Sequence, residues 1–224
     1  STGSTNIVEK TCANSLRIPF VNKILPRAKY IFLLRNGHDV VQSAIKRWQA
    51  PMELQYLLKK ARFVPVRDLP YYALRYMKHR LNKVYSNDSS LPLWGPVFEE
   101  LAGLRQTHQL QDVVAMQWVK SVQLADRGLK KLPNDRVLTC RYEEIVEKPL
   151  EQLSKVTDFL GLRTSPMELQ QSVSDVRHAK ATTTSNFESL KLSSDIKPLF
   201  SELLHNLGYD DSRYHGTKPT QIAA

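Results

Sequence analysis

The feature that most limits the fold is an unbroken β-prone run at residues 29–34, apolar from Tyr30 onward, which stops abruptly at Arg35. Its β-prone side chains do not alternate with polar ones, a pattern typical of a strand covered on both faces in a parallel sheet. Turn-forming residues follow, with Asp39 as the expected N-cap of a helix that continues to Pro51. The sequence therefore predicts a strand, a loop and a helix in succession.

Strands and helices are predicted to alternate along most of the chain. Strands are expected at residues 7–8 and 136–142. Helices are expected at residues 14–25, 110–131, 149–160 and 198–207, and the interrupted helical pattern at residues 52–107 indicates helices with an inserted loop. Because one core usually fills about 100–200 residues, these 224 residues indicate a single α/β domain.

Composition argues against several classes of protein. The two cysteines, Cys12 and Cys140, lie far apart, and the six histidines show no metal-ligand spacing, so neither a disulfide framework nor a metal site is expected. Free thiols fit a reducing compartment, and we expect a cytoplasmic protein. The longest strongly apolar run, Ile31 to Leu34, is far shorter than the roughly 20 residues of a membrane span.

The net charge of +10 and the pI near 9.6 predict a surface that attracts anions. Nucleic acid, anionic lipid and a phosphorylated small molecule are the candidate partners. The basic residues are spread along the chain in pairs such as Lys59-Lys60 and Lys130-Lys131, and this distribution argues against nucleic acid. Membrane association and the oligomeric state are left open.

The end of the predicted strand at Leu34 is the first place to look for a ligand, because open parallel sheets bind ligands beyond the carboxyl ends of their strands. Arg35 offers a permanently charged fork, and Asn36-Gly37 can point backbone amides at an anion. Ser43 is expected in the first turn of the following helix, at the positive end of the dipole. Together these groups suit a phosphate monoester, although Arg35 taken alone fits better with a structural ion pair to Asp39 or a nearby carboxylate.

Three stretches in order then resemble one enzyme family. Residues 35–43 (Arg-Asn-Gly-His-Asp-Val-Val-Gln-Ser) look like the 3′-phosphate motif of sulfotransferases that use 3′-phosphoadenosine 5′-phosphosulfate (PAPS). Residues 9–14 are similar to the Glu-Lys-Thr-Pro loop of the family, with Cys12 in place of proline, and residues 141–146 resemble its closing signature. Trp94-Gly95-Pro96 and Gln117-Trp118 are similar to bacterial members that act on carbohydrate or lipid-linked acceptors.

The resemblance implies a P-loop-NTPase-like parallel sheet flanked by helices, and it implies roles for individual residues. Arg35 and Ser43 would bind the 3′-phosphate of the nucleotide, and Tyr142 would lie near the adenine. Lys10 would lie near the transferring sulfuryl group, where a cation offsets charge on the leaving oxygen. His108 is a candidate acid-base catalyst, as is His38, because imidazole accepts a hydroxyl proton at neutral pH.

The expected function is transfer of a sulfuryl group from PAPS to a hydroxyl of a carbohydrate or glycolipid, with 3′-phosphoadenosine 5′-phosphate (PAP) as the product. In the family a strand and a loop that grips the 5′-phosphosulfate lie well upstream of the position of Glu9. We therefore expect residues 1–224 to be one sulfotransferase-like domain that lacks this strand and loop. The alternatives are a non-catalytic protein that binds PAP or a polyanion, and a nucleic-acid-binding protein.

Overall fold

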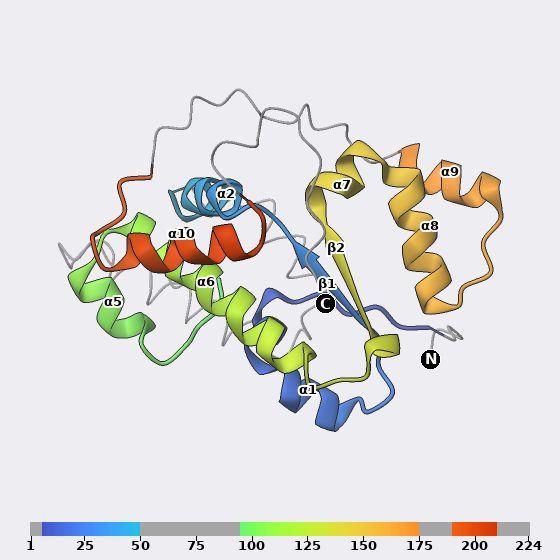
Figure 1. Cartoon of the computed structure of the whole chain (residues 1–224), viewed down its shortest axis with the longest axis horizontal. Helices are drawn as coiled ribbons and strands as arrows, with labels where there is room; N and C mark the ends of the chain where they lie inside the picture. Colours follow the sequence, from blue (N-terminus) through green and yellow to red (C-terminus); the bar gives the residue numbers. More distant parts are fainter. Residues whose placement is uncertain (1–5, 50–94, 175–189, 210–224) are drawn as a thin grey trace, which may run out of the picture. The chain divides into compact units, whose positions relative to one another are not determined.

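The computed structural model describes residues 6–49, 95–174 and 190–209 of the chain (Figure 1). The chain divides into two compact units, one made of Ser1–Ser43 with Gly95–Ala224 and the other of Ala44–Trp94. Most of the second unit, and with it the predicted helices and loop at residues 52–94, lies outside the described residues. The elements below belong to the first unit, except that helix α2 (Gly37–Gln49) runs from the first unit into the second.

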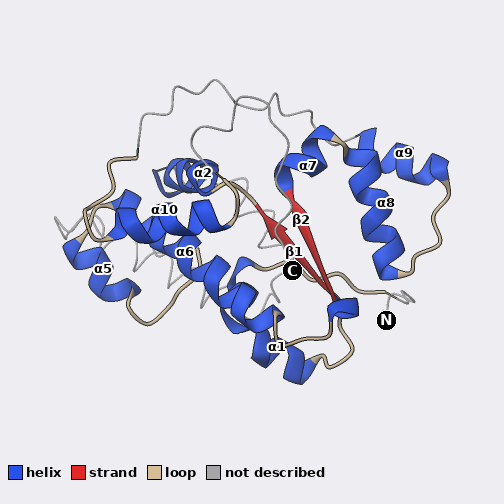
Figure 2. Ribbon diagram, in the orientation of Figure 1, coloured by secondary structure: helices blue, strands red, loops and turns tan. Residues whose placement is uncertain are grey.

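A parallel pair of strands lies at the centre of the first unit. Strand β1 (Tyr30–Leu34) pairs with β2 (Val137–Arg141) in a register that runs from Tyr30 opposite Val137 to Leu34 opposite Arg141 (Figure 2). Both predicted strands are thereby confirmed to within one residue at either end. Because the strands are parallel, the residues that follow them, Arg35 and Tyr142, leave the sheet at the same edge.

The two faces of β1 differ in burial, so the prediction that both are covered is wrong. Ile31 and Leu33 are 42% and 49% exposed. On the other face, Tyr30 and Phe32 pack against a buried cluster of Ile18, Ala125 and Leu129. A continuous apolar run shows that both faces can be buried, but the elements packed against each face decide whether they are.

The core beside the sheet is built on the long helix α6 (Leu110–Leu129), as predicted for residues 110–131. The 3₁₀ turn η1 (Cys12–Arg17) and helix α1 (Ile18–Ile24) pack on α6 and together occupy the predicted helix at residues 14–25. Helix α10 (Ile196–Asn206) also lies against α6, where the Phe200 and Trp118 rings are 5.1 Å apart. Helix α5 (Leu101–Thr107) completes this layer.

A second group of helices follows β2. Helix α7 (Tyr142–Glu147) begins directly after the strand, and α8 (Pro149–Leu160) ends at Gly161, whose positive φ of 72° is the expected left-handed cap. The turn η3 (Asn134–Arg136) precedes β2, and helix α9 (Pro166–Ser174), which was not predicted, packs on α8. The predicted strand at Ile7-Val8 is wrong, because these exposed residues pair with no described strand.

No described helix combines the length and apolar character needed to cross a bilayer. Within the described ranges, no group of three or more histidine, cysteine or acidic side chains is placed to hold a metal ion. The two cysteines are free thiols: Cys12 is exposed and Cys140 is buried in β2.

Candidate functional site

The turn between β1 and α2 places the predicted phosphate-binding residues. Asn36, not Asp39 as predicted, caps the helix: its Oδ1 accepts the His38 N–H at 2.9 Å, and its carbonyl accepts the Val40 N–H at 3.1 Å. Asp39 lies in the first turn. The prediction that Ser43 lies in the first turn is also wrong, since the helix begins at Gly37 and Ser43 falls in the second turn.

Gly37 brings this turn close to the core. A Cβ at this position would lie 2.9 Å from carbon atoms of Phe200 and of Trp118, a distance that leaves no room for a side chain. The His38 ring meets Phe200 edge-on, with the ring centroids 5.2 Å apart. The backbone beside Arg35 therefore rests directly on aromatic side chains of α6 and α10.

Arg35 and Tyr142, which follow the two strands, are brought together as the sequence predicts. The Arg35 guanidinium carbon lies 4.4 Å from the centre of the Tyr142 ring, within the range of a cation–π contact. The Arg35 side chain is 35% exposed, yet its Nε is buried and has no hydrogen-bond partner among the described residues. The guanidinium is therefore held against an aromatic ring with hydrogen-bonding capacity unused.

Asp39 forms an ion pair with Arg35, but the contact is loose. Arg35 Nη2 lies 3.8 Å from Asp39 Oδ2, which is longer than a hydrogen bond. Burial raises the pKa of the Asp39 carboxyl above its ordinary value; the Arg35 charge opposes this shift, and the negative charge of Glu143 adds to it. The ion pair with Asp39 exists, as the alternative interpretation expects, but it leaves Arg35 able to bind a further anion.

Glu143 lies beneath the turn, and the sequence had assigned it no role. Its Oε1 accepts the Asn36 backbone N–H at 2.9 Å, and its Oε2 accepts the Tyr209 hydroxyl at 3.0 Å. The available signal was its position in the first turn of the helix after β2, at the same sheet edge as Arg35. Tyr209 and Phe200 had no local signal, because they reach the site from a distant part of the chain.

The remaining predicted site residues are not bonded to Arg35 or Tyr142 in the described structure. Ser43 and Lys10 are exposed, and among the described residues no hydrogen bond or ion pair joins either of them to Arg35 or Tyr142. Lys10 belongs to a segment without regular structure, next to Glu9, whose carboxylate accepts hydrogen bonds from Thr11 and Asn14. The predicted roles of Lys10 and Ser43 stay predictions.

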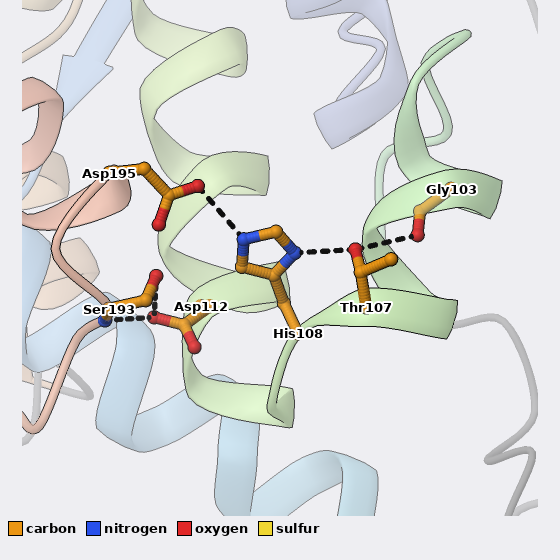
Figure 3. A network of polar contacts seen from close by, with 6 residues as sticks. All are labelled: Gly103, Thr107, His108, Asp112, Ser193 and Asp195. Atoms are coloured by element: carbon orange, nitrogen blue, oxygen red, sulfur yellow. Dashed lines mark hydrogen bonds and ion pairs between the residues drawn. The ribbon is translucent and has the colours of Figure 1, made fainter.

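His108 lies in a separate polar network at the junction of α5, α6 and α10 (Figure 3). Its Nε2 is 2.9 Å from Asp195 Oδ2, and its Nδ1 is 2.7 Å from the Thr107 hydroxyl, which also lies 3.1 Å from the Gly103 carbonyl. With Asp195 as acceptor, Nε2 carries a proton. The single Thr107 hydroxyl proton goes either to the Gly103 carbonyl or to Nδ1, and the tautomer and charge of the ring decide which. Both ring nitrogens are therefore occupied by partners.

The same network borders a depression of about 300 Å³ lined by Thr107, His108, Gln109, Asp112 and residues 191–193. Buried Asp112 accepts the Ser193 N–H at 2.8 Å and the Ser193 hydroxyl at 3.2 Å, which fastens the segment before α10 to α6. The neighbouring Ser193 and His108 side chains lower the pKa of Asp195 to about 2. No described contact joins this network to Arg35.

Comparison with known proteins assigns this arrangement to a family. The model of the sulfotransferase domain matches residues 18–202, which include β1, the Arg35 turn, β2 and α7. The chain belongs to the sulfotransferase domain family. This confirms the family resemblance: residues 35–43 and 141–146 lie within the match, whereas residues 9–14 lie before it.

A solved structure supports the same fold for this sulfotransferase domain. The chain is similar to the "Sulfotransferase Domain from the Curacin Biosynthetic Pathway", with a TM-score of 0.50 and 18% sequence identity. The match covers 88% of this chain and 60% of the other, so the chain spans about three fifths of that domain. At this identity the likeness concerns the fold alone. No curated protein sequence matches the chain.

Proposed function

We propose that this chain is part of an enzyme that transfers a sulfuryl group from PAPS to a hydroxyl of a carbohydrate or glycolipid. The proposal includes a P-loop-NTPase-like sheet in which the Arg35 turn takes the 3′-phosphate of the nucleotide. One observation carries it: Arg35, at the carboxyl end of β1, is stacked 4.4 Å from Tyr142 with its Nε unpartnered. Family membership over residues 18–202 supports the reaction class.

In this proposal each residue has a separate task. Arg35 holds the 3′-phosphate with charged hydrogen bonds, Ser43 adds a hydroxyl donor, and Tyr142 lies beside the adenine. Lys10 offsets negative charge on the phosphate oxygen from which the sulfur departs. The acceptor oxygen forms its bond to sulfur as the bond to that phosphate oxygen breaks, and PAP leaves.

The acceptor hydroxyl must also lose its proton, and His108 is the proposed base. Its Nδ1 lies 2.7 Å from the Thr107 hydroxyl, so an acceptor hydroxyl would have to take the place of Thr107. His108 could then accept the proton at Nδ1 while its Nε2 remains hydrogen-bonded to Asp195 at 2.9 Å. The depression beside His108 offers an open approach for this exchange.

Calorimetric titration with PAP tests the phosphate site. Replacing Arg35 with alanine should weaken binding by about 2 kcal/mol or more, the range for loss of a charged hydrogen-bonding partner. Arg27→Ala is the matched control, because Arg27 is an exposed arginine before β1 and outside the proposed site. Equal PAP affinity in the two variants would refute the assignment.

The charge of +10 keeps a second function in view, a non-catalytic protein that binds PAP or a polyanion. Transfer of labelled sulfate from PAPS to carbohydrate acceptors separates the two functions, because the binding protein would retain PAP without turnover. Binding to an anionic polymer that falls steeply with salt and ignores added PAP would favour the polyanion.

A further inference from the structure

Glu143 connects three segments that are far apart in the sequence. One carboxylate oxygen accepts the Asn36 N–H from the β1–α2 turn, 107 residues away. The other accepts the Tyr209 hydroxyl, 66 residues away, from the segment just after α10. All three residues are buried or partly buried, so these hydrogen bonds are shielded from competing water.

The bond to Asn36 acts on the residue next to Arg35. Asn36 is only 4% exposed, and without Glu143 its N–H would lose this hydrogen bond in a buried position. Asn36 also caps α2 through its own side chain. The backbone that carries Arg35 is therefore fixed on its C-terminal side by one carboxylate.

Tyr209 holds Glu143 from the other side. Burial raises the pKa of the Tyr209 phenol, and the Glu143 charge adds to the shift, so the hydroxyl stays protonated and can donate. Tyr209 is itself held by Arg141, which lies 4.8 Å from its ring centre and donates to the Leu207 carbonyl at 2.6 Å. The chain of contacts thus runs from the end of α10 to the turn beside Arg35.

We propose that Glu143 is a positioning residue, which holds the β1–α2 turn between Asn36 and Tyr209 so that Arg35 is kept in its anion-binding orientation. This inference rests on the proposed function, because PAP is the anion in question. Glu143 acts through Asn36 and contacts no part of the nucleotide in this scheme. The negative charge of Glu143 repels a nearby anion, so charge alone predicts that removing Glu143 strengthens PAP binding. The positioning role predicts the opposite, a weaker binding.

Calorimetry with PAP on Glu143→Ala, Glu143→Gln and Tyr209→Phe tests the proposal, with Glu147→Gln as the control from the same helix. Glu143→Ala should weaken PAP binding by about tenfold, since the turn loses a charged hydrogen-bond acceptor. Glu143→Gln should fall between this variant and the unmodified chain, because its amide oxygen can still accept the Asn36 N–H. Tyr209→Phe keeps every charge and should lose roughly threefold.

The outcomes separate this inference from the proposed function. If Glu143 acted only through its charge, both Glu143 variants would bind PAP more tightly, and that result, or unchanged affinity, overturns the positioning role. If Arg35→Ala lost PAP binding and the Glu143 and Tyr209 variants did not, the positioning role would be overturned and the proposed function would stand. Failure of the unmodified chain to bind PAP overturns both.

A second measurement covers the case in which Glu143→Ala does not fold. Hydrogen exchange of the Asn36 amide should become faster in Tyr209→Phe and in Glu143→Gln than in Glu147→Gln, because a weakened acceptor protects the N–H less. Thermal unfolding of the same variants shows whether the fold persists. Unchanged Asn36 exchange in both variants overturns the proposal.

Discussion

Two regions of the same unit differ in how completely their polar groups are hydrogen-bonded. We call them the Arg35 corner, which is the β1–α2 turn with Tyr142, and the His108 corner, which is His108 with Thr107 and Asp195. At Arg35, a guanidinium is stacked on Tyr142 with a buried Nε that lacks a partner in the described structure. At His108, both ring nitrogens meet partners within 2.9 Å. The Arg35 side chain is 35% exposed and makes only a loose ion pair, so it can take a ligand, whereas a fully bonded ring must first exchange a partner. The comparison favours the proposed binding role of Arg35 over the proposed catalytic role of His108, which requires that Thr107 first give way.

The largest expected effect concerns His108. If it serves as the base, His108→Ala should lower turnover in a sulfuryl-transfer assay by about 100-fold. Its PAP affinity should stay unchanged, because no described contact joins His108 to Arg35. Thr107→Val is the companion variant: it removes the hydroxyl that the acceptor must displace and should leave turnover within a fewfold of the unmodified chain. Unchanged turnover in His108→Ala would make this corner structural only.

Gly37→Ala should act on the other corner through packing. The added Cβ would meet Phe200 and Trp118 at 2.9 Å, and overpacking of this kind costs about 1–3 kcal/mol of the free energy of unfolding. Gly103→Ala is the control, because a Cβ there meets nothing within 4 Å and alanine favours a helix. Urea denaturation of both variants measures the difference. Equal stability would show that the turn can move away from the aromatic side chains.

Asp39→Asn should raise PAP affinity, and this effect should be smaller than those of the two preceding variants. Removing the carboxylate that lies 3.8 Å from Arg35 frees the guanidinium for PAP, and we expect affinity to rise by about threefold. The raised pKa of Asp39 means that protonation begins above the ordinary range of a carboxyl group as the pH falls. PAP affinity measured between pH 7 and pH 4 should include an increase on acidification that is absent in Asp39→Asn. An identical pH profile in both proteins would contradict this.

Tyr30→Phe should have the smallest effect. The Tyr30 hydroxyl is buried and lacks a hydrogen-bond partner among the described residues, and burial raises the pKa of the phenol. Removing an unsatisfied hydroxyl should leave the free energy of unfolding unchanged or raise it by about 1 kcal/mol. Thermal unfolding measures this. A clear loss of stability would mean that the hydroxyl has a partner after all.

Much of the Arg35 corner was predictable because its signals are local. An apolar run followed by arginine, and a second β-prone run ending at Tyr142, predict two strands of a parallel sheet with Arg35 and Tyr142 at their carboxyl ends. The direct pairing of the two strands comes from the structure. The choice of Asn36 over Asp39 as the cap was not predictable. Both residue types cap helices well, and the contact between Asn36 and Glu143 belongs to the tertiary structure.

The unpredicted parts share a dependence on distant segments. The exposure of Ile31 and Leu33 depends on what packs against that face of β1, which the apolar run does not encode. Tyr209 reaches Glu143 across 66 residues, and no spacing rule links the two. The network of His108 with Asp195 spans 87 residues in the same way.

The five-residue ladder between β1 and β2 has a consequence for evolution as well as for folding. Side chains alternate between faces along a strand, so slipping β2 by one position would carry Tyr142 away from Arg35 and reverse which of its side chains face α6. Substitutions among the apolar residues of these strands can therefore alter the contact between Arg35 and Tyr142, on which the proposed nucleotide binding depends. Variants of Phe32 or Leu138 are better screened by ligand affinity than by stability alone.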